Sequence, residues 1–171
     1  MIFEKYHPIM TKHYELDWLT TFKVKEIFAL RHDASVAKLT NRDVDATIMD
    51  TAAHVNRVMS KIMHNDALVW GIGDKRTGEF LGTFGFDSFV ADRTTAAITF
   101  ELLPSAQRQG VMSEVLSHML SFAFDELDLQ KVIATVQSAN VQTVMLLKGQ
   151  GFTLDRETTG ELQFKLRQDE R

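Results

Sequence analysis

Between residues 67 and 127 the spacing of apolar residues changes once, and this change constrains the fold more than any other feature. Three segments, ALVWGIG, EFLGTFGF and AAITFELL, carry apolar side chains at alternate positions, as strands do. The next segment, GVMSEVLSHMLSFAFDEL, carries them at helical spacing and predicts a helix. Pro104 lies between the two patterns and ends the last strand, because proline has no amide proton for the sheet ladder.

Other periodic segments flank this centre. In chain order we expect a strand at 12–19, helices at 22–33 and 50–66, strands at 67–73, 79–86 and 96–103, a helix at 110–127, a strand at 131–137, a helix at 141–150, and two strands beyond residue 151. Asp50 or Thr51 is the expected cap of the second helix, and residues 33–50 are expected to be loop-rich. Phe80, Phe84 and Phe86 are expected on one face of their strand. The order β-α-α-β-β-β-α-β-α-β-β predicts an α/β (α+β) fold with one mixed sheet.

Composition narrows the class of protein. The 171 residues, of which 44% are hydrophobic, suit one domain over 1–171 with a real core. A net charge of -4, with both signs spread along the chain, argues against binding to bulk nucleic acid. The chain has no cysteine, which excludes disulfides, thiolate metal sites and a cysteine nucleophile. No secretion signal or membrane-spanning run is recognised, so we expect a soluble cytoplasmic protein.

The stretch from Gln107 to Gly110 lies between the strand that Pro104 stops and the first turn of a helix. A helix start leaves backbone amides without partners and carries partial positive charge, so it is a site for a phosphate. Gly110 permits close approach of an anion, and Arg108 could add a charged contact. The same pattern also fits a plain connector. The spacings of the nucleoside-triphosphate loop and of the dinucleotide fingerprint are both absent.

Four features together resemble one family. QRQGVM is similar to the loop by which the Gcn5-related N-acetyltransferase (GNAT) superfamily holds the coenzyme A pyrophosphate, and FELLP before it resembles the preceding strand. NVQT followed by LLKGQGF resembles a later segment of the same superfamily. TKHYELDWLT and ALVWGIGDKRTGEFLGTFGF resemble the branch of ribosomal-protein N-terminal acetyltransferases (RimJ/RimL-like). The resemblance covers essentially the whole chain and implies the GNAT fold, with a mostly antiparallel sheet flanked by helices.

This resemblance implies direct acetyl transfer from acetyl-CoA, the co-substrate, to an amine. It implies cofactor contacts by Leu102, Leu103, Gln107, Arg108, Gln109, Gly110, Val111, Met112, Ser113, Asn140 and Thr143. A backbone amide near Leu102 or Leu103 would bind the thioester carbonyl oxygen. Asn140 would cap the short helix, hydrogen-bond the pantetheine arm, or do both.

The catalytic residues are more open. Thr143 is a candidate donor to the leaving thiolate, and a hydroxyl satisfied within its own helix is the alternative. Glu101, on the fourth strand, is the first candidate for the general base, and a solvent-facing strand carboxylate is the alternative. Glu161 is the second candidate, and water could serve because an α-amine has a pKa of about 8. The spacing of the six histidines predicts no metal site.

The chain departs from the family pattern at three positions. Met112 stands where the loop usually ends on a small residue, Thr143 replaces a serine, and Ala97 occupies the position of an early strand carboxylate. The acceptor is therefore open: a protein N-terminus, a peptide or a small amine. Residues 32–50 are expected to border its cleft. We expect no nucleic-acid or membrane partner and a monomer or homodimer. The alternative function is a coenzyme A-binding module without catalytic activity.

Overall fold

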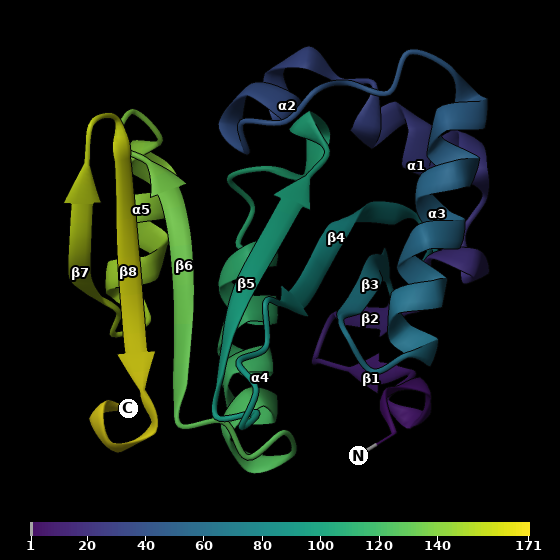
Figure 1. Ribbon diagram of the computed structural model, residues 1–171. Coiled ribbons are helices and arrows are strands. Elements are labelled where there is room, and N and C mark those ends of the chain that lie inside the picture. The colour runs from purple at the N-terminus through teal and green to yellow at the C-terminus, as the bar shows by residue number, and fades with distance from the viewer. Residues whose placement is uncertain (1) are drawn as a thin grey trace.

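A computed structural model describes residues 2–171, which fold around one eight-stranded sheet (Figure 1). The strand order is β1-β2-β3-β4-β5-β6-β8-β7. The strands are β1 (Ile9–Met10), β2 (Tyr14–Asp17), β3 (Leu68–Asp74), β4 (Phe80–Asp87), β5 (Thr95–Leu102), β6 (Lys131–Gln137), β7 (Thr153–Thr158) and β8 (Glu161–Arg167). Every neighbouring pair is antiparallel except β5 and β6, which run parallel. The predicted mixed, mostly antiparallel sheet is confirmed.

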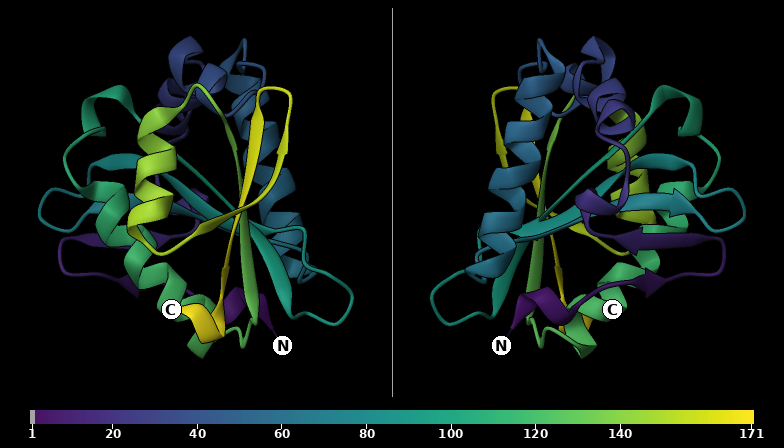
Figure 2. Two further views of the ribbon diagram at one scale, coloured as in Figure 1. Left: turned by 90° about the vertical axis from the view of Figure 1, so that its left-hand side faces the viewer. Right: turned by 90° about the vertical axis from the view of Figure 1, so that its right-hand side faces the viewer.

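Five α-helices cover the two faces of the sheet (Figure 2). They are α1 (Val24–Arg31), α2 (Ala34–Leu39), α3 (Ile48–Met63), α4 (Val111–Asp125) and α5 (Val141–Gly149). Helices α4 and α5 lie on one face and α3 lies on the other, with α1 and α2 beside it (Figure 2). Four short 3-10 helices add Phe3–Lys5, Leu19–Thr21, Pro104–Ala106 and Gln168–Glu170. No helix within residues 2–171 has the length and apolar character needed to cross a bilayer.

The core on the α4 face is largely aromatic. Trp70 on β3 and Phe86 on β4 both pack against Phe122 of α4, with ring centroids 5.7 Å and 6.2 Å away. Trp70 and Phe86 are fully buried. Aromatic side chains bury large apolar areas, so this cluster fixes the C-terminal part of α4 against the centre of the sheet.

Three predictions about the N-terminal half are corrected. The strand predicted at 12–19 is the shorter β2, Tyr14–Asp17, and an additional strand, β1, precedes it. The predicted loop 33–50 contains α2, which Asp33 caps by accepting a hydrogen bond from the Val36 amide. The cap of α3 is Thr47, which forms a capping box with Asp50, and not Asp50 or Thr51 itself. Thr51 is instead buried. These segments are short, so their apolar periodicity is weak.

The predicted aromatic stripe on β4 is wrong for Phe80. Phe84 lies opposite Trp70, but a bulge between Ile72 and Gly73 shifts the register, so Phe80 lies opposite Gly73. Phe80 therefore packs edge-on against Phe22, on the other face of the sheet from Phe84. An extra residue in one strand reverses the facing of every side chain beyond it, which alternation alone does not predict.

Candidate active site

Strands β5 and β6 pair only at one end. The parallel ladder joins Thr95–Ala97 to Lys131–Ile133 and then stops, while β5 continues to Leu102 beside β4 and β6 continues to Gln137 beside β8. The two strands diverge beyond the ladder (Figure 1). A cavity of about 430 Å³ lies there, bordered by β5, the start of α4 and the start of α5. The end of a parallel pairing thus creates the site.

Most residues predicted for the site border this cavity. Those that line it are Glu101, Leu102, Gln107, Arg108, Gly110, Val111, Met112, Ser113, Asn140 and Thr143. Leu103 and Gln109 do not line it. The fold therefore brings together two segments that are some thirty residues apart in the sequence.

The loop before α4 presents a run of free backbone amides. The N–H groups of residues 108–113 donate to no backbone or side-chain acceptor within residues 2–171. Arg108 and Gly110 have positive φ angles of 61° and 81°, and Gly110 caps α4 without a side chain. A Cβ at Gly110 would meet no atom within 4 Å, so the space beside it is open. Unpaired amides at a helix N-terminus form a site for an anion.

Two glutamines brace the loop from within. Gln107 Nε2 donates to the Leu102 carbonyl at 3.0 Å, and Gln109 Nε2 donates to the Ser105 carbonyl at 2.7 Å. Arg108 is exposed and forms no ion pair within the described part of the chain. The glutamine side chains thus stabilise the loop, and the Arg108 guanidinium is left to contact a ligand.

Asn140 begins α5 and fixes the opposite wall. Its Oδ1 accepts a hydrogen bond from the Thr143 amide at 3.3 Å, as a helix cap does. Asn140 and Thr143 both line the cavity. The capping alternative for Asn140 is therefore realised, while its side-chain NH2 group keeps its donors for another partner.

The two candidate amides at the end of β5 differ. The Leu103 N–H donates to the Leu81 carbonyl at 2.9 Å and belongs to the ladder with β4. Successive amides of a strand point in opposite directions, so the Leu102 N–H points toward the side where β6 has diverged. Of the two, only Leu102 offers an amide donor to the cavity.

A second cavity of about 370 Å³ lies against the opposite face of the sheet, beneath α1 and α3. Six residues line both cavities: Leu39, Thr40, Phe100, Glu101, Asn140 and Thr143. We call the place bordered by these six residues the window. Leu39, Thr40 and Arg42 come from the stretch 32–50 that the sequence predicts to border the acceptor. The two cavities therefore adjoin at the window, where a ligand bound in one can contact a ligand bound in the other.

Glu101 lies at the window with its carboxylate fully engaged. Arg42 Nε donates to Oε2 at 2.6 Å and Nη2 donates to Oε1 at 3.0 Å. The Thr40 hydroxyl donates to Oε2 at 2.6 Å. The side chains of Arg42 and Glu101 are only 19% and 11% exposed, so water does not screen this pair strongly. Glu161 borders neither cavity, and lies at the start of β8 opposite Gln137.

A second ion pair supports the same loop. Arg31 Nε donates to Asp45 Oδ2 at 2.7 Å, and the Thr51 hydroxyl donates to the same oxygen at 2.8 Å. Burial opposes ionisation of Asp45, but these hydrogen bonds outweigh it and lower its pKa. His54 lies nearby on the cavity wall, and burial together with the Arg31 charge lowers its pKa to about 4. At neutral pH His54 is therefore an uncharged group.

The sequence did not reveal the roles of Arg42, Thr40 and His54. Arg42 and its neighbours fit a solvated loop equally well, because their partner Glu101 is 59 residues away in the chain. The sequence offered one signal: the stretch around Arg42 is polar, and Glu101 is the single carboxylate on an otherwise mostly apolar strand. Only the fold identifies the two as partners.

Comparison with known proteins agrees with this architecture. The family model described as "Acetyltransferase (GNAT) domain" matches residues 15–153, which is most of the chain. The uncharacterized N-acetyltransferase YoaA of Bacillus subtilis is 27% identical over 146 residues, covering 85% of this chain and 82% of YoaA.

Two solved structures share the fold over nearly their whole length. Spermidine N-acetyltransferase from Vibrio cholerae, in complex with CoA and spermine, superposes with a TM-score of 0.80 at 15% identity, over 92% of this chain and 97% of the other. Ribosomal-protein-S5-alanine acetyltransferase from Vibrio fischeri has a TM-score of 0.78 at 15% identity, over 96% and 99% of the two chains.

Proposed function

The chain belongs to the GNAT family of N-acetyltransferases, and we propose that it transfers the acetyl group of acetyl-CoA to an amine through the window. The observation that carries this proposal is the junction of two cavities at the diverging strands, one bordered by free amides and the other by polar side chains. The resemblance of the sequence to this family is thereby confirmed at the level of family and fold.

The residues of the first cavity fit coenzyme A. The six free amides of residues 108–113 and the Arg108 guanidinium match the charge and shape of a diphosphate. The diverging edge of β5 and the Asn140 side chain offer hydrogen bonds to the amides of a pantetheine arm. Bound there, acetyl-CoA would supply an acetyl group already activated as a thioester.

We assign the transfer roles to two groups at the window. The Leu102 amide is the donor to the carbonyl oxygen, which gains negative charge as the amine attacks. The Thr143 hydroxyl, on the first turn of α5, is the proton donor to the leaving sulfur. The Leu102 amide is already held in place by the strand, so little free energy is needed to orient it. A preoriented donor stabilises the charge that develops on the oxygen during the reaction.

For the removal of the amine proton we favour water. The three donors from Arg42 and Thr40 occupy both oxygens of Glu101, so an incoming ammonium must compete with them. An α-amine with a pKa of about 8 is already partly neutral at pH 7. We therefore assign Glu101 to positioning, where it holds Thr40 and Arg42 at the edge of the window.

The acceptor enters from the second cavity. A small amine and the N-terminal residues of a peptide both suit a cavity of about 370 Å³. The resemblance to the ribosomal-protein branch favours the peptide, while the limited volume favours the small amine.

The test is a thiol-release assay with acetyl-CoA and a panel of peptides and small amines, run beside calorimetry of acetyl-CoA binding. We expect acetyl-CoA to bind. With at least one amine, we expect the amount of coenzyme A released to equal the amount of acetylated amine formed. Binding without release for every amine would favour the alternative of a coenzyme A-binding module. Absence of binding would overturn the proposal.

A further inference from the structure

The charges around the second cavity are mostly paired with one another. Arg31 is bound by Asp45, and Arg42 is bound by Glu101, so neither guanidinium is free to attract an anion. His54 is uncharged at neutral pH, since burial and the Arg31 charge lower its pKa. Two charged groups that line the cavity remain, Lys61 on α3 and Asp87 on β4.

Asp87 is a carboxylate without a partner. No hydrogen bond or ion pair reaches its side chain anywhere in residues 2–171, although the side chain is half-buried. It lies directly opposite Ala97 of β5, whose methyl group is too small to cover it. A half-buried carboxylate that faces a cavity favours a cation there, because surrounding water screens it only in part.

Asp87 lies far from the window along the sheet. Glu101 and Ala97 face the same side of β5, and they are opposite Thr83 and Asp87 of β4. The four residue steps from position 97 to position 101 span about 14 Å of strand. Asp87 is therefore too distant to accept the proton of the reacting amine, but it can bind a second group at the far end of an extended acceptor.

Resting on the proposed function, we infer that Asp87 binds a second ammonium group of the acceptor, and that the preferred acceptors are linear diamines long enough to reach from the window to Asp87. Thr99 lies between the two ends, Thr83 lies opposite Glu101 at the window end, and Thr135 lines the cavity from β6; these side chains supply hydroxyls but no charge. The amine at the window loses its proton to water before it attacks the thioester, while the other amine stays protonated at Asp87. Because an alkyl ammonium has a pKa of about 10, the rate with diamines should keep rising with pH above 8.

Lys61 acts against this preference. It is exposed on α3, and its ammonium forms no ion pair with Asp87, since none within 4.0 Å is found in the described chain. A flexible, solvated ammonium interacts more weakly than a fixed, half-buried carboxylate. Asp87 therefore dominates, and removal of the Lys61 charge should increase the preference for diamines.

The experiment measures kcat/KM for linear diamines of increasing length, each beside the monoamine of the same length. We expect kcat/KM to rise with diamine length to a maximum, with no such maximum for monoamines. Asp87→Asn should lower the diamine-to-monoamine ratio about tenfold or more at that maximum. Asp128→Asn, an equal charge change on an exposed residue outside both cavities, should leave the ratio unaltered. A ratio that Asp87→Asn does not change overturns the inference.

Two further measurements keep the inference separate from the proposed function. Lys61→Gln, at an exposed position that does not threaten folding, should raise the diamine-to-monoamine ratio; a preference for amines that carry a carboxylate, abolished by Lys61→Gln, would overturn the inference. Calorimetry of diamine binding in the presence of coenzyme A reports on Asp87 without any turnover. If the protein acetylates monoamines but Asp87→Asn leaves its affinity for diamines unchanged, the proposed function holds and this inference is wrong.

Discussion

Arg42 holds both carboxylate oxygens of Glu101, with Nε 2.6 Å from Oε2 and Nη2 3.0 Å from Oε1. The same guanidinium donates to the carbonyls of Arg31 and Asp43, both at 3.0 Å, and to that of Leu30 at 3.4 Å. One side chain thus connects β5, α1 and the loop after α2 beside the window. The planar, five-donor guanidinium is suited to this role, and an ammonium is not.

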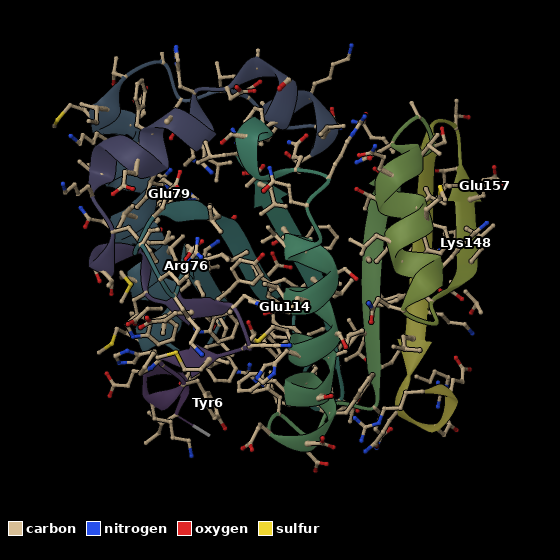
Figure 3. All side chains as sticks on the ribbon, turned by 180° about the vertical axis from the view of Figure 1, so that it is seen from behind. Tyr6, Arg76, Glu79, Glu114, Lys148 and Glu157 are labelled. Carbon is tan, nitrogen blue, oxygen red and sulfur yellow. The ribbon has the colours of Figure 1, made fainter. Side chains whose placement is uncertain are left out.

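Arg42→Ala should therefore lower the free energy of unfolding by about 3 kcal/mol, because it leaves the carboxylate of Glu101 partly buried without its cation. Arg42→Lys should recover only part of the loss, since a single ammonium cannot hold both oxygens. Urea denaturation measures both. The control is Arg76→Ala, on the exposed turn between β3 and β4 (Figure 3). Equal stability of the Arg42→Ala and Arg76→Ala proteins would contradict this role.

Glu101→Gln separates positioning from proton transfer. We expect a lower rate, because the neutral amide holds Arg42 less firmly, while the rise of kcat/KM with pH stays at the pKa of the amine, about 8 for an α-amine. The measurement is the pH–rate profile of both proteins with the same acceptor. If the variant lost the ascending limb altogether, Glu101 would be the base and water would not.

Gly110→Asp should weaken acetyl-CoA binding at least about tenfold, since it places a carboxylate beside the free amides of the loop. Gly160→Asp is the matched control. Gly160 has a φ of 78° against 81° for Gly110, and neither has an atom within 4 Å of an added Cβ. Both variants therefore carry the same backbone strain, but Gly160 lies in the β7–β8 turn. Calorimetry that found equal affinities would show the loop to be a connector only.

Glu114 joins α4 to the turn between β1 and β2 (Figure 3). Its burial opposes ionisation, but hydrogen bonds from His13 and Thr11 outweigh it and lower the pKa. The resulting stabilisation is complete above the ordinary pKa of 4.5 and disappears as the pH falls through the folded-state pKa. Glu114→Gln should cost about 1 kcal/mol at pH 7 and nothing in strong acid.

Urea denaturation across that pH range gives the difference directly. Glu157→Gln, on the exposed edge strand β7, is the control and should change stability little at any pH. A Glu114→Gln deficit that persisted unchanged in strong acid would contradict the assigned ionisation.

His54 should make the protein less stable in mild acid. Its pKa is about 4 in the folded state and 6.5 ordinarily, because burial and the Arg31 charge oppose protonation. Between these two values the unfolded chain binds the proton and the folded chain does not, so stability falls as the pH decreases from about 6.5 to about 4. His54→Gln should flatten this slope, as denaturation at several pH values will show. An NMR titration that gave His54 an ordinary pKa would disprove the effect.

The sequence by itself determined the elements whose periodicity is long and strong. The alternation in β3, β4 and β5 and the helical spacing of α4 are repeated over enough residues to be unambiguous. Pro104 and Gly110 likewise placed the proposed cofactor loop at a strand-to-helix junction, because each residue restricts the backbone in its own way. Residue types and their spacing therefore suffice to propose an anion site at Gln107 to Gly110, and the resemblance to the GNAT superfamily added Val111 to Ser113 and Asn140 to it.

Tertiary structure alone decided the rest. That β5 and β6 stop pairing after Ala97 and Ile133 depends on how far each strand follows its other neighbour, which no local pattern encodes. The facing of Phe80 depends on a single bulge. Glu101 and Arg42 meet, and Asp87 has no partner within residues 2–171, because distant segments fold onto one face of the sheet. Local propensity acts between near neighbours in the chain, whereas charge pairing and cavities depend on distances that exist only after folding.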